Sequence, residues 1–471
     1  MRITGSALLS LALMMPCGAQ QRPTRSLPDP LTQIPRVPIP CTIQDGFTLA
    51  AAGDLIGPDR PQTLLAVPGF VDVMKILKQA DHGFANQEGS IFDLENFKGS
   101  PAAENGGGIP LGIPAVARDL RNMGIDMVSK ANNHATDWGL DGLAATEHVL
   151  DDAGIAHAGS GRTRAAARAP AFLETAKGRI ALVAAASTFT PMSVAGSIGA
   201  EVAGRPGISV LRTRRVTLVT APEMAALRTI VARQGRAPAA DAKEITLNGQ
   251  AYRVSEKPGL TYEMNPYDRF EILRSIRGAK EVSSLVMFSI HAHETANGDA
   301  DAREPADFLP AFFHNVIDAG ADIVVTHGPH VLHGVEIYKG KPIFYGLASF
   351  FFEMELGHVT NPDNLEEINL DMTPLTYPEY VRSRFPGFPP NWFDSVVAVS
   401  EFRGGQASEV RLYPLMLTRE KGPHPQGMPK PAKGDDARRI LEELQRDSAA
   451  FGTKISIENN IGIIRVAPLA N

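Results

Sequence analysis

Cysteine is almost absent from this chain, which has 2 cysteines among 471 residues. Cys17 lies in an N-terminal segment that we expect to be removed, so the mature chain would keep Cys41 alone and could form no intramolecular disulfide. The scarcity also excludes a structural zinc site of the usual cysteine-rich type. Stability must therefore come from the hydrophobic core and from any bound metal ion.

Long tracts of lysine and arginine are also missing. The 46 basic and 52 acidic residues give a formal net charge of −6. Spread over this length, that charge creates no field that would attract a polyanion, so nucleic acid is not an expected partner. The 44% hydrophobic and 21% charged residues are ordinary for a soluble globular enzyme.

The N-terminal apolar run that ends before Pro16 is too short to span a bilayer. It follows the basic residue Arg2 and precedes the small residue Ala19, an order that is typical of a secretory signal peptide. Residues 1–19 are therefore predicted to be a signal peptide, and the protein is predicted to be periplasmic or secreted. An uncleaved membrane anchor or a lipoprotein is the alternative, which Pro16 directly before Cys17 disfavours.

Residues 20–40 contain six prolines among polar residues and are predicted to be an extended leader. The folded domain is predicted to cover residues 41–471. Within it, apolar runs that suit buried strands alternate with helical patterns, which predicts an α/β fold with a substantially parallel sheet. The main expected strands are Phe47–Ala52, Gly83–Ala85, Asp126–Lys130, Ile180–Ala186, Leu285–Ile290, Asp322–Thr326, Val396–Phe402 and Val410–Leu417. The main expected helices are Val71–Ala80, Ile113–Met123, Leu140–Ala153, Tyr267–Lys280, Pro305–Ala319 and Asp435–Ala450.

Two less regular stretches interrupt this alternation. The first, at about residues 190–267, is rich in arginine and carries an expected helix at Pro222–Gln234 and an expected hairpin around Asn248-Gly249. The second, at about residues 355–392, is dense in proline and aromatic residues. We expect both to be insertions that form a cap or rim.

A polar cluster follows each of five expected strands. Because parallel strands direct their carboxyl ends to one edge of a sheet, these clusters are expected to converge on one crevice. Carboxylate, amide and imidazole groups together form the ligand set of a hard or borderline divalent ion such as Mn, Fe or Zn. The sequence therefore predicts a site for one or two divalent metal ions. The clusters are Gly53-Asp54, Asn86-Gln87-Glu88, Asn132-Asn133-His134, His291-Ala292-His293-Glu294 and His327-Gly328-Pro329-His330.

Each cluster taken alone also has a purely structural explanation. Asp54 follows a glycine and could be a turn residue, and Glu88 could pair with a surface cation. His327 and His330 could be loop histidines with satisfied hydrogen bonds. The asparagines before His134 could turn the chain and cap the next helix. The occurrence of five such clusters at strand ends favours the metal site over these separate explanations.

Several longer segments resemble the successive motifs of the CapA family, the capsule and poly-gamma-glutamate synthesis proteins. They are GDLIG, NQEGSIFD, SKANNHATDWGLDGL, AGIAHAGSGR and DAGADIVVTHGPHVLHGVEIYKGKPIFYGLASFFF, and they cover about Phe47 to Phe352. This family is similar in fold to the calcineurin-like metallophosphoesterases. The resemblance implies an α/β fold of the metallophosphoesterase-like type, a layered sheet sandwich flanked by helices.

The resemblance also implies which residues hold the metal. The first-motif aspartate would be a ligand, the glutamate would stand where phosphoesterases commonly have a bridging aspartate, and an asparagine would bind through its amide oxygen. Histidines from the last two clusters would complete the metal shells. The implied ligands are Asp54, Glu88, Asn133, His291, His327 and His330, with His293 as the alternative to His291.

The remaining members of the third cluster are the expected catalytic residues. His134 would face the substrate as proton donor or oxyanion stabiliser, and Asn132 would orient it. Arginines of the first insertion would complete an anion-binding rim, although a solvated face is the simpler explanation for them. They are Arg205, Arg212, Arg214 and Arg215.

These residues predict an exported metal-dependent hydrolase whose metal-activated water attacks a phosphoester or related bond. The expected substrate is an anionic small molecule, peptide or polymer. Two alternatives stay open. One is a non-hydrolytic role in assembling or anchoring capsule or poly-gamma-glutamate, together with cell-envelope assembly partners. The other is metal-dependent peptide epimerisation.

Overall fold

The computed structural model describes residues 42–467, apart from residues 58–59, 68, 236–237, 300–301, 420–425 and most of 354–386. The predicted signal peptide, the proline-rich leader and Cys41 lie outside the described residues, as does most of the second expected insertion. No helix in the described part of the chain is both long and apolar enough to cross a membrane.

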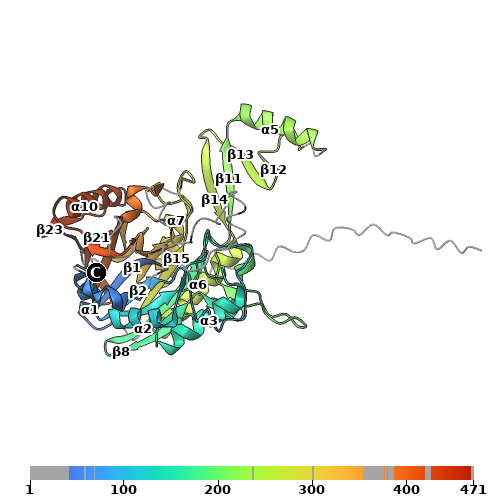
Figure 1. Ribbon diagram of the computed structural model, residues 1–471. Helices are drawn as coiled ribbons and strands as arrows, with labels where there is room; N and C mark the ends of the chain where they lie inside the picture. Colours follow the sequence, from blue (N-terminus) through green and yellow to red (C-terminus); the bar gives the residue numbers. More distant parts are fainter. Residues whose placement is uncertain are drawn as a thin grey trace, which may run out of the picture.

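A ten-stranded sheet forms one half of the body (Figure 1). Its strands follow the order β23-β24-β21-β20-β1-β2-β5-β6, with β19 also paired to β1 and β22 to β21. The neighbours β1, β2, β5 and β6 run parallel, as does the pair of β1 and β19. The strands are β1 (Phe47–Ile56), β2 (His82–Asn86), β5 (Ile125–Ser129), β6 (Ala156–Ala158), β19 (Ser349–Phe352), β20 (Asp394–Arg403), β21 (Gln406–Leu417), β22 (Pro429–Pro431), β23 (Ser456–Glu458) and β24 (Ile461–Arg465).

A six-stranded sheet in the order β17-β18-β16-β15-β9-β8 forms the other half. Its central strands β9, β15, β16 and β18 are parallel. β15 and β16 are buried along their whole length, because both faces of the sheet are covered. The strands are β8 (Ala171–Thr175), β9 (Gly178–Ala186), β15 (Leu285–His291), β16 (Ile323–His327), β17 (Val335–Tyr338) and β18 (Lys341–Phe344).

The two sheets pack face to face, and helices cover their outer faces. The core between the sheets joins residues such as Leu49 and Met127 of the first sheet to Leu182 and Met287 of the second. A second core lies between the ten-stranded sheet and α1, α2 and α3, and a third between the six-stranded sheet and α6 and α7. This four-layer order confirms the expected metallophosphoesterase-like class. The helices are α1 (Phe70–Gln79), α2 (Pro114–Met123), α3 (Gly139–Asp152), α6 (Pro266–Glu281), α7 (Phe308–Ala319) and α10 (Gly434–Ala449).

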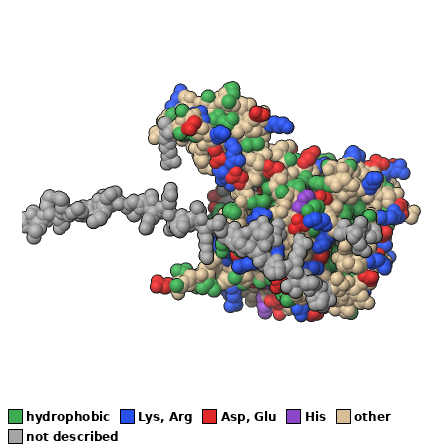
Figure 2. Space-filling model, turned by 180° about the vertical axis from the view of Figure 1, so that it is seen from behind, with side chains coloured by type: hydrophobic (Ala, Val, Ile, Leu, Met, Phe, Trp, Pro, Cys, Tyr) green, Lys and Arg blue, Asp and Glu red, His purple; other side chains and the backbone are tan. Residues whose placement is uncertain are grey.

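The first irregular stretch is more ordered than we expected. The helix is α5 (Ala221–Arg233), and the hairpin is β12 (Glu244–Leu247) and β13 (Gln250–Val254), whose Asn248 and Gly249 both have positive φ. β11 (Thr213–Val219) and β14 (Gly259–Met264), which we did not predict, complete a four-stranded sheet. We call residues 213–264 the lobe. Figure 1 shows the lobe standing out from the body, and Figure 2 shows acidic and basic side chains mixed on its surface.

The remaining short elements lie between the main ones. Helix α7 begins at Phe308 and not at the expected Pro305, because Pro305 instead forms an isolated bridge with Thr295. The short elements are η1 (Pro61–Ala66), β3 (Ser90–Ile91), β4 (Leu111–Gly112), β7 (Ser160–Gly161), α4 (Arg164–Ala167), η2 (Pro191–Ser193), β10 (Gly207–Ile208) and η5 (Pro390–Phe393).

Gly53 allows the backbone of β1 to approach the chain just before β19. A Cβ atom at this position would lie 1.8 Å from the carbonyl oxygen of Ala348. That oxygen accepts a hydrogen bond of 3.1 Å from the backbone N–H of Asp54. Ala348 itself has φ 57°, a conformation that costs free energy in a residue with a side chain. Glycine is therefore required at position 53, because no side chain fits there.

We predict that Gly53→Ala lowers the free energy of unfolding by about 3 kcal/mol, because the new methyl group must push the Ala348 carbonyl away. Urea unfolding of the two proteins measures the difference. Gly278→Ala is the matched control, since a Cβ at this position of α6 meets no atom within 4 Å. That change is expected to raise the free energy of unfolding by about 0.5–1 kcal/mol. Equal stability of Gly53→Ala and the parent protein would contradict the packing argument.

Candidate metal centre and proton donor

The carboxyl ends of the parallel strands in the two sheets meet at one crevice. In the first sheet Asp54 of β1 is in register with Asn86 of β2, and Asn86 with Ser129 of β5. In the second sheet His291 of β15 is in register with His327 of β16. A bulge after Ala51 shifts the register of β1 beside β2, so that Asp54 stands opposite Asn86. The crevice thus lies where parallel strands of both sheets end.

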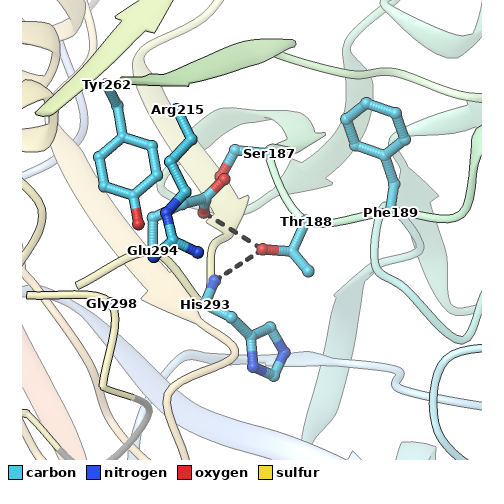
Figure 3. Close-up of a pocket in the computed structure, with 8 residues that line it drawn as sticks. All are labelled: Ser187, Thr188, Phe189, Arg215, Tyr262, His293, Glu294 and Gly298. Atoms are coloured by element: carbon cyan, nitrogen blue, oxygen red, sulfur yellow. Dashed lines mark hydrogen bonds between the residues drawn. The ribbon is translucent and has the colours of Figure 1, made fainter. Parts of the chain in front are cut away.

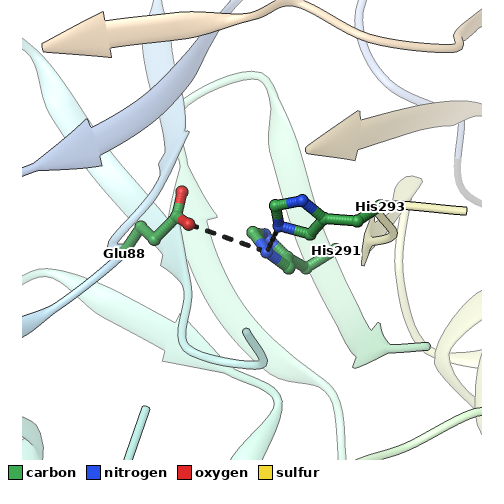
Figure 4. Close-up of side chains that lie close together, drawn as sticks. All are labelled: Glu88, His291 and His293. Atoms are coloured by element: carbon green, nitrogen blue, oxygen red, sulfur yellow. Dashed lines mark hydrogen bonds and ion pairs between the residues drawn. The ribbon is translucent and has the colours of Figure 1, made fainter. Parts of the chain in front are cut away.

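Glu88, His291 and His293 form the tightest group of potential ligands, with one ligand atom of each within 4.8 Å of the others (Figure 4). The Nε2 atoms of His291 and His293 are 2.9 Å apart, and Nε2 of His291 is 3.7 Å from Oε1 of Glu88. The structure therefore places both His291 and His293 beside Glu88, so both imidazoles are in position to be metal ligands.

Asp54 and His327 lie beside this group. Oδ1 of Asp54 is 3.5 Å from Nδ1 of His327 and accepts a hydrogen bond of 2.8 Å from Nδ2 of Asn86. The same amide nitrogen lies 3.2 Å from Nδ1 of His291. The backbone N–H of Gly328 donates to Oδ2 of Asp54 at 3.3 Å. Asn86 therefore connects the aspartate of one sheet to a histidine of the other.

Several buried polar atoms of the crevice make no hydrogen bond within the described part of the chain. They include both carboxylate oxygens of Glu88, the amide oxygen of Asn133 and both ring nitrogens of His327. Buried polar groups are normally paired, so this concentration of unpaired acceptors indicates that something binds among them. Carboxylate, amide oxygen and imidazole together suit a divalent cation. The residues present therefore fit a metal ion.

Burial shifts the pKa of two carboxyl groups and three imidazoles towards the neutral form, namely Asp54, Glu88, His291, His293 and His327. It raises the pKa of Asp54 to about 7, and burial and the charge of Asp54 raise that of Glu88 well above its usual value. Burial lowers the pKa of His293 to about 4 and that of His327 to about 3. Neutral imidazole is the form that binds metal. Two neighbouring buried carboxylates, by contrast, repel each other unless a cation joins them.

His134 lies at the edge of this group and is held by a carboxylate. Its Nδ1 is 2.7 Å from Oδ2 of Asp137, while its Nε2 faces Oε1 of Glu88 at 3.9 Å. The other oxygen of Asp137 accepts a hydrogen bond of 2.9 Å from the N–H of Gly106. A Cβ at Gly106 would come within 2.7 Å of the His134 ring, so the glycine loop packs directly on the imidazole. The ring is thereby fixed with Nε2 towards the crevice.

Asn132 has a different position from the one we expected. Its Nδ2 donates to Oδ1 of Asn86 at 3.2 Å and to the carbonyl of Gln87 at 2.8 Å. The side chain that orients His134 is therefore Asp137. Asn132 instead fixes the turn that carries Glu88. Asn133, its neighbour, donates to the carbonyl of Gly106 at 2.9 Å, which leaves its amide oxygen unpaired.

Lys130 is a fully buried cation beneath the same turn. Its Nζ donates to the carbonyl of Gly89 at 2.8 Å and lies 3.4 Å from that of Gln87. Burial lowers its pKa to about 8. The ammonium group thus holds the backbone on both sides of Glu88.

His330 lies on the outer side of the group. Its Nδ1 is 3.3 Å from Oγ of Ser349, and its ring centroid is 5.7 Å from that of His293 and 4.5 Å from that of Trp392. Burial lowers its pKa to about 3. His330 is therefore a neighbour of His293, the member of the group whose ring it contacts.

The four arginines expected at the rim have different surroundings. Arg205 donates to the carbonyl of Val194, Arg212 is paired with Asp268, and Arg214 is paired with Glu244 and Glu263. The fourth, Arg215, lines a cavity beside His293 (Figure 3). The simpler explanation, a structural or solvated role, therefore holds for three of the four.

Sequence reasoning missed Asp137, Lys130 and the loop at Gly106. Asp137 and Lys130 stand within the motif SKANNHATDWGLDG, so their nearness to His134 along the chain was a usable signal. Gly106 lies 28 positions before His134, and only the folded chain shows that it contacts the ring.

Comparison with known proteins identifies the family of this chain. The profile of the family described as "Bacterial capsule synthesis protein PGA_cap" matches residues 48–354. This span contains every crevice residue from Asp54 to His330. An uncharacterized protein of Sinorhizobium fredii is 40% identical over 437 residues, which cover 90% of this chain and 94% of that protein.

More distant relatives carry functional names. A probable polyglutamine synthesis accessory protein of Mycobacterium tuberculosis is 27% identical over 268 residues, 52% of this chain and 54% of its own. The capsule biosynthesis protein CapA of Bacillus anthracis is 24% identical over 288 residues, 60% of this chain and 53% of its own. Since the family profile matches well over half of the chain, the protein belongs to the CapA family of bacterial capsule synthesis proteins.

Proposed function

We propose that this protein is an exported metal-dependent hydrolase that acts on a phosphoester or related bond in capsule or cell-surface polymer metabolism. One observation carries the proposal. One of the unpaired buried oxygens of Glu88, Oε1, lies 3.9 Å from Nε2 of His134, whose other ring nitrogen is held by a buried carboxylate. A site that only bound a polymer would not require a proton donor fixed in this way.

Glu88, His291 and His293 would hold the metal, with Asp54, Asn133 and His327 as further ligands around them and His330 beside His293. A divalent ion bound there supplies Lewis-acid polarisation of the reacting bond and makes water nucleophilic near neutral pH. The apolar strands of both sheets surround these residues, so the charges of the site act in a medium of low polarity.

His134 would be the general acid. Asp137 accepts from Nδ1–H and stabilises the protonated ring, which leaves Nε2–H free to face the crevice. As water adds to the phosphorus or carbonyl carbon, the bond to the leaving oxygen or nitrogen breaks and the Nε2 proton passes to that atom. Gly106, packed on the ring, keeps the imidazole from turning. The names of the relatives in M. tuberculosis and B. anthracis support a cell-surface polymer as the ultimate target.

The first test is metal binding and its pH dependence. We expect chelator-stripped protein to bind one or two Mn, Fe or Zn ions, measured by calorimetry and elemental analysis. The ion must displace a proton from Asp54, whose pKa is about 7, and from Glu88, whose pKa is raised well above its usual value. Protons therefore compete below those values, and affinity should rise about tenfold per pH unit and displaced proton between about pH 5 and pH 7.

Glu88→Gln should abolish tight binding, whereas Asp141→Asn, at an exposed acidic residue of α3, should leave it unchanged. Metal-free protein with full activity would refute the proposal.

The second test concerns the proton donor. Hydrolysis of an aryl phosphate is expected to stop with a chelator and to fall at least about 100-fold in His134→Ala, with metal content retained. Asp137→Asn should cause a loss of similar size, because an amide donates to Nδ1 and disfavours the protonated ring.

Asp141→Asn again serves as the control. If the protein instead cleaves or epimerises a polyglutamate peptide and hydrolyses no phosphoester, the same residues would be assigned to one of the alternative reactions.

A further inference from the structure

A cavity of about 380 Å³ opens next to His293, between the body and the lobe (Figure 3). The body contributes Ser187 and Thr188, which follow β9, and Glu294, which follows His293. The lobe contributes Arg215 from β11 and Tyr262 from β14. The volume lies at the small end of the range for ligand pockets, about 300–1,000 Å³. It suits one terminal residue of a chain better than a long polymer segment.

The carboxylate of Glu294 is fixed in place by hydroxyl groups. Its Oε2 accepts from Ser187 Oγ at 2.7 Å and from Thr188 Oγ1 at 3.2 Å, and its Oε1 accepts a weaker bond from Thr213 Oγ1 at 3.4 Å. Burial raises the pKa of this carboxyl group, while these hydrogen bonds favour its charged form. Thr188 Oγ1 also accepts from the backbone N–H of His293 at 2.9 Å, which ties the cavity to the metal centre.

Arg215 provides the opposite charge. Among the described residues, neither Arg215 nor Glu294 takes part in an ion pair, although both line the same cavity. Gly298 makes room for the guanidinium, since a Cβ there would lie 3.3 Å from Nη2 of Arg215. The neighbouring Arg214, by contrast, has two glutamate partners within the lobe. The cavity is therefore lined by a cationic and an anionic side chain that are not paired with each other.

A ligand that matches both charges must itself carry a cation and an anion. The amino-terminal residue of a peptide-like chain has this chemistry, because its ammonium group can face Glu294 while its carboxylate can face Arg215. An internal segment of a polyanion offers only carboxylates, which Glu294 would repel.

We infer that this cavity binds the free amino-terminal residue of a peptide-like, carboxylate-bearing chain, so that the lobe directs the metal centre to chain ends. The inference rests on the proposed function only for the reaction that follows binding. Arg215 and Tyr262 belong to the lobe and Glu294 to the body, so both parts are needed to form the cavity.

The test is direct binding by calorimetry to the full mature chain stripped of metal. The probes are the dipeptide glutamyl-glutamate and its N-acetylated form, which lacks the ammonium group. The parent protein should bind the free dipeptide at least about tenfold more tightly, equal to about 1.4 kcal/mol. Arg215→Gln and Glu294→Gln should each remove most of that affinity, and Glu294→Gln should leave the affinity for the acetylated probe unchanged.

Arg214→Gln, one residue along the same strand and directed to other partners, is the matched control and should bind like the parent. If Arg215→Gln unfolds at a lower temperature than the parent, Arg215→Lys distinguishes loss of the positive charge from loss of folding. The lysine keeps the charge, so this variant should retain part of the affinity. Equal binding of both probes, no binding of either, or unchanged affinity in Arg215→Gln would overturn the inference. Since neither metal nor turnover enters these measurements, their failure and the failure of the hydrolase proposal are distinguishable.

Discussion

Two buried carboxylates at the ends of neighbouring chain segments are the constraint around which this structure is arranged. Asp54 and Glu88 are both fully buried, and the charge of Asp54 raises the pKa of Glu88. An apolar crevice tolerates such a pair only if protons or cations accompany it. The neutral imidazoles, the amide nitrogen of Asn86 and the N–H of Gly328 all lie around them. The crevice is thus organised to accept positive charge.

Sequence reasoning predicted the body of the fold well because its signals are local. The buried strands β9, β15 and β16 are continuous apolar runs, and the helices between them have clear periodicity. The polar residues directly after these runs were found for the same reason. The helix start at Phe308 was missed, since Pro305 is equally acceptable at a helix start and in the bridge that it forms.

What the sequence did not reveal depends on contacts between distant segments. Strands β11 and β14 are separated by 39 residues and pair only because the chain returns after α5 and the hairpin. Apolar and polar residues alternate only weakly along these strands, because much of the lobe is exposed on both faces. The contact of Gly106 with His134 and the cavity at Arg215 have the same origin. Among four similar arginines, only tertiary structure distinguishes Arg215, which lines the cavity beside His293.

Lys130 links the segment that carries Glu88 to the segment that carries Asn133 and His134. It follows β5 and precedes Asn133 and His134 in the chain, while its side chain grips the backbone on both sides of Glu88. The Lys130 ammonium group therefore holds Glu88, the expected ligand, at the end of β5. The main chain holds His134, the expected acid, at the same strand end. Arg215 belongs to the lobe, whereas Glu88 and His134 belong to the strand ends of the body. Substitutions within the lobe can therefore change the cavity beside His293 without altering the contacts that hold Glu88 next to His134.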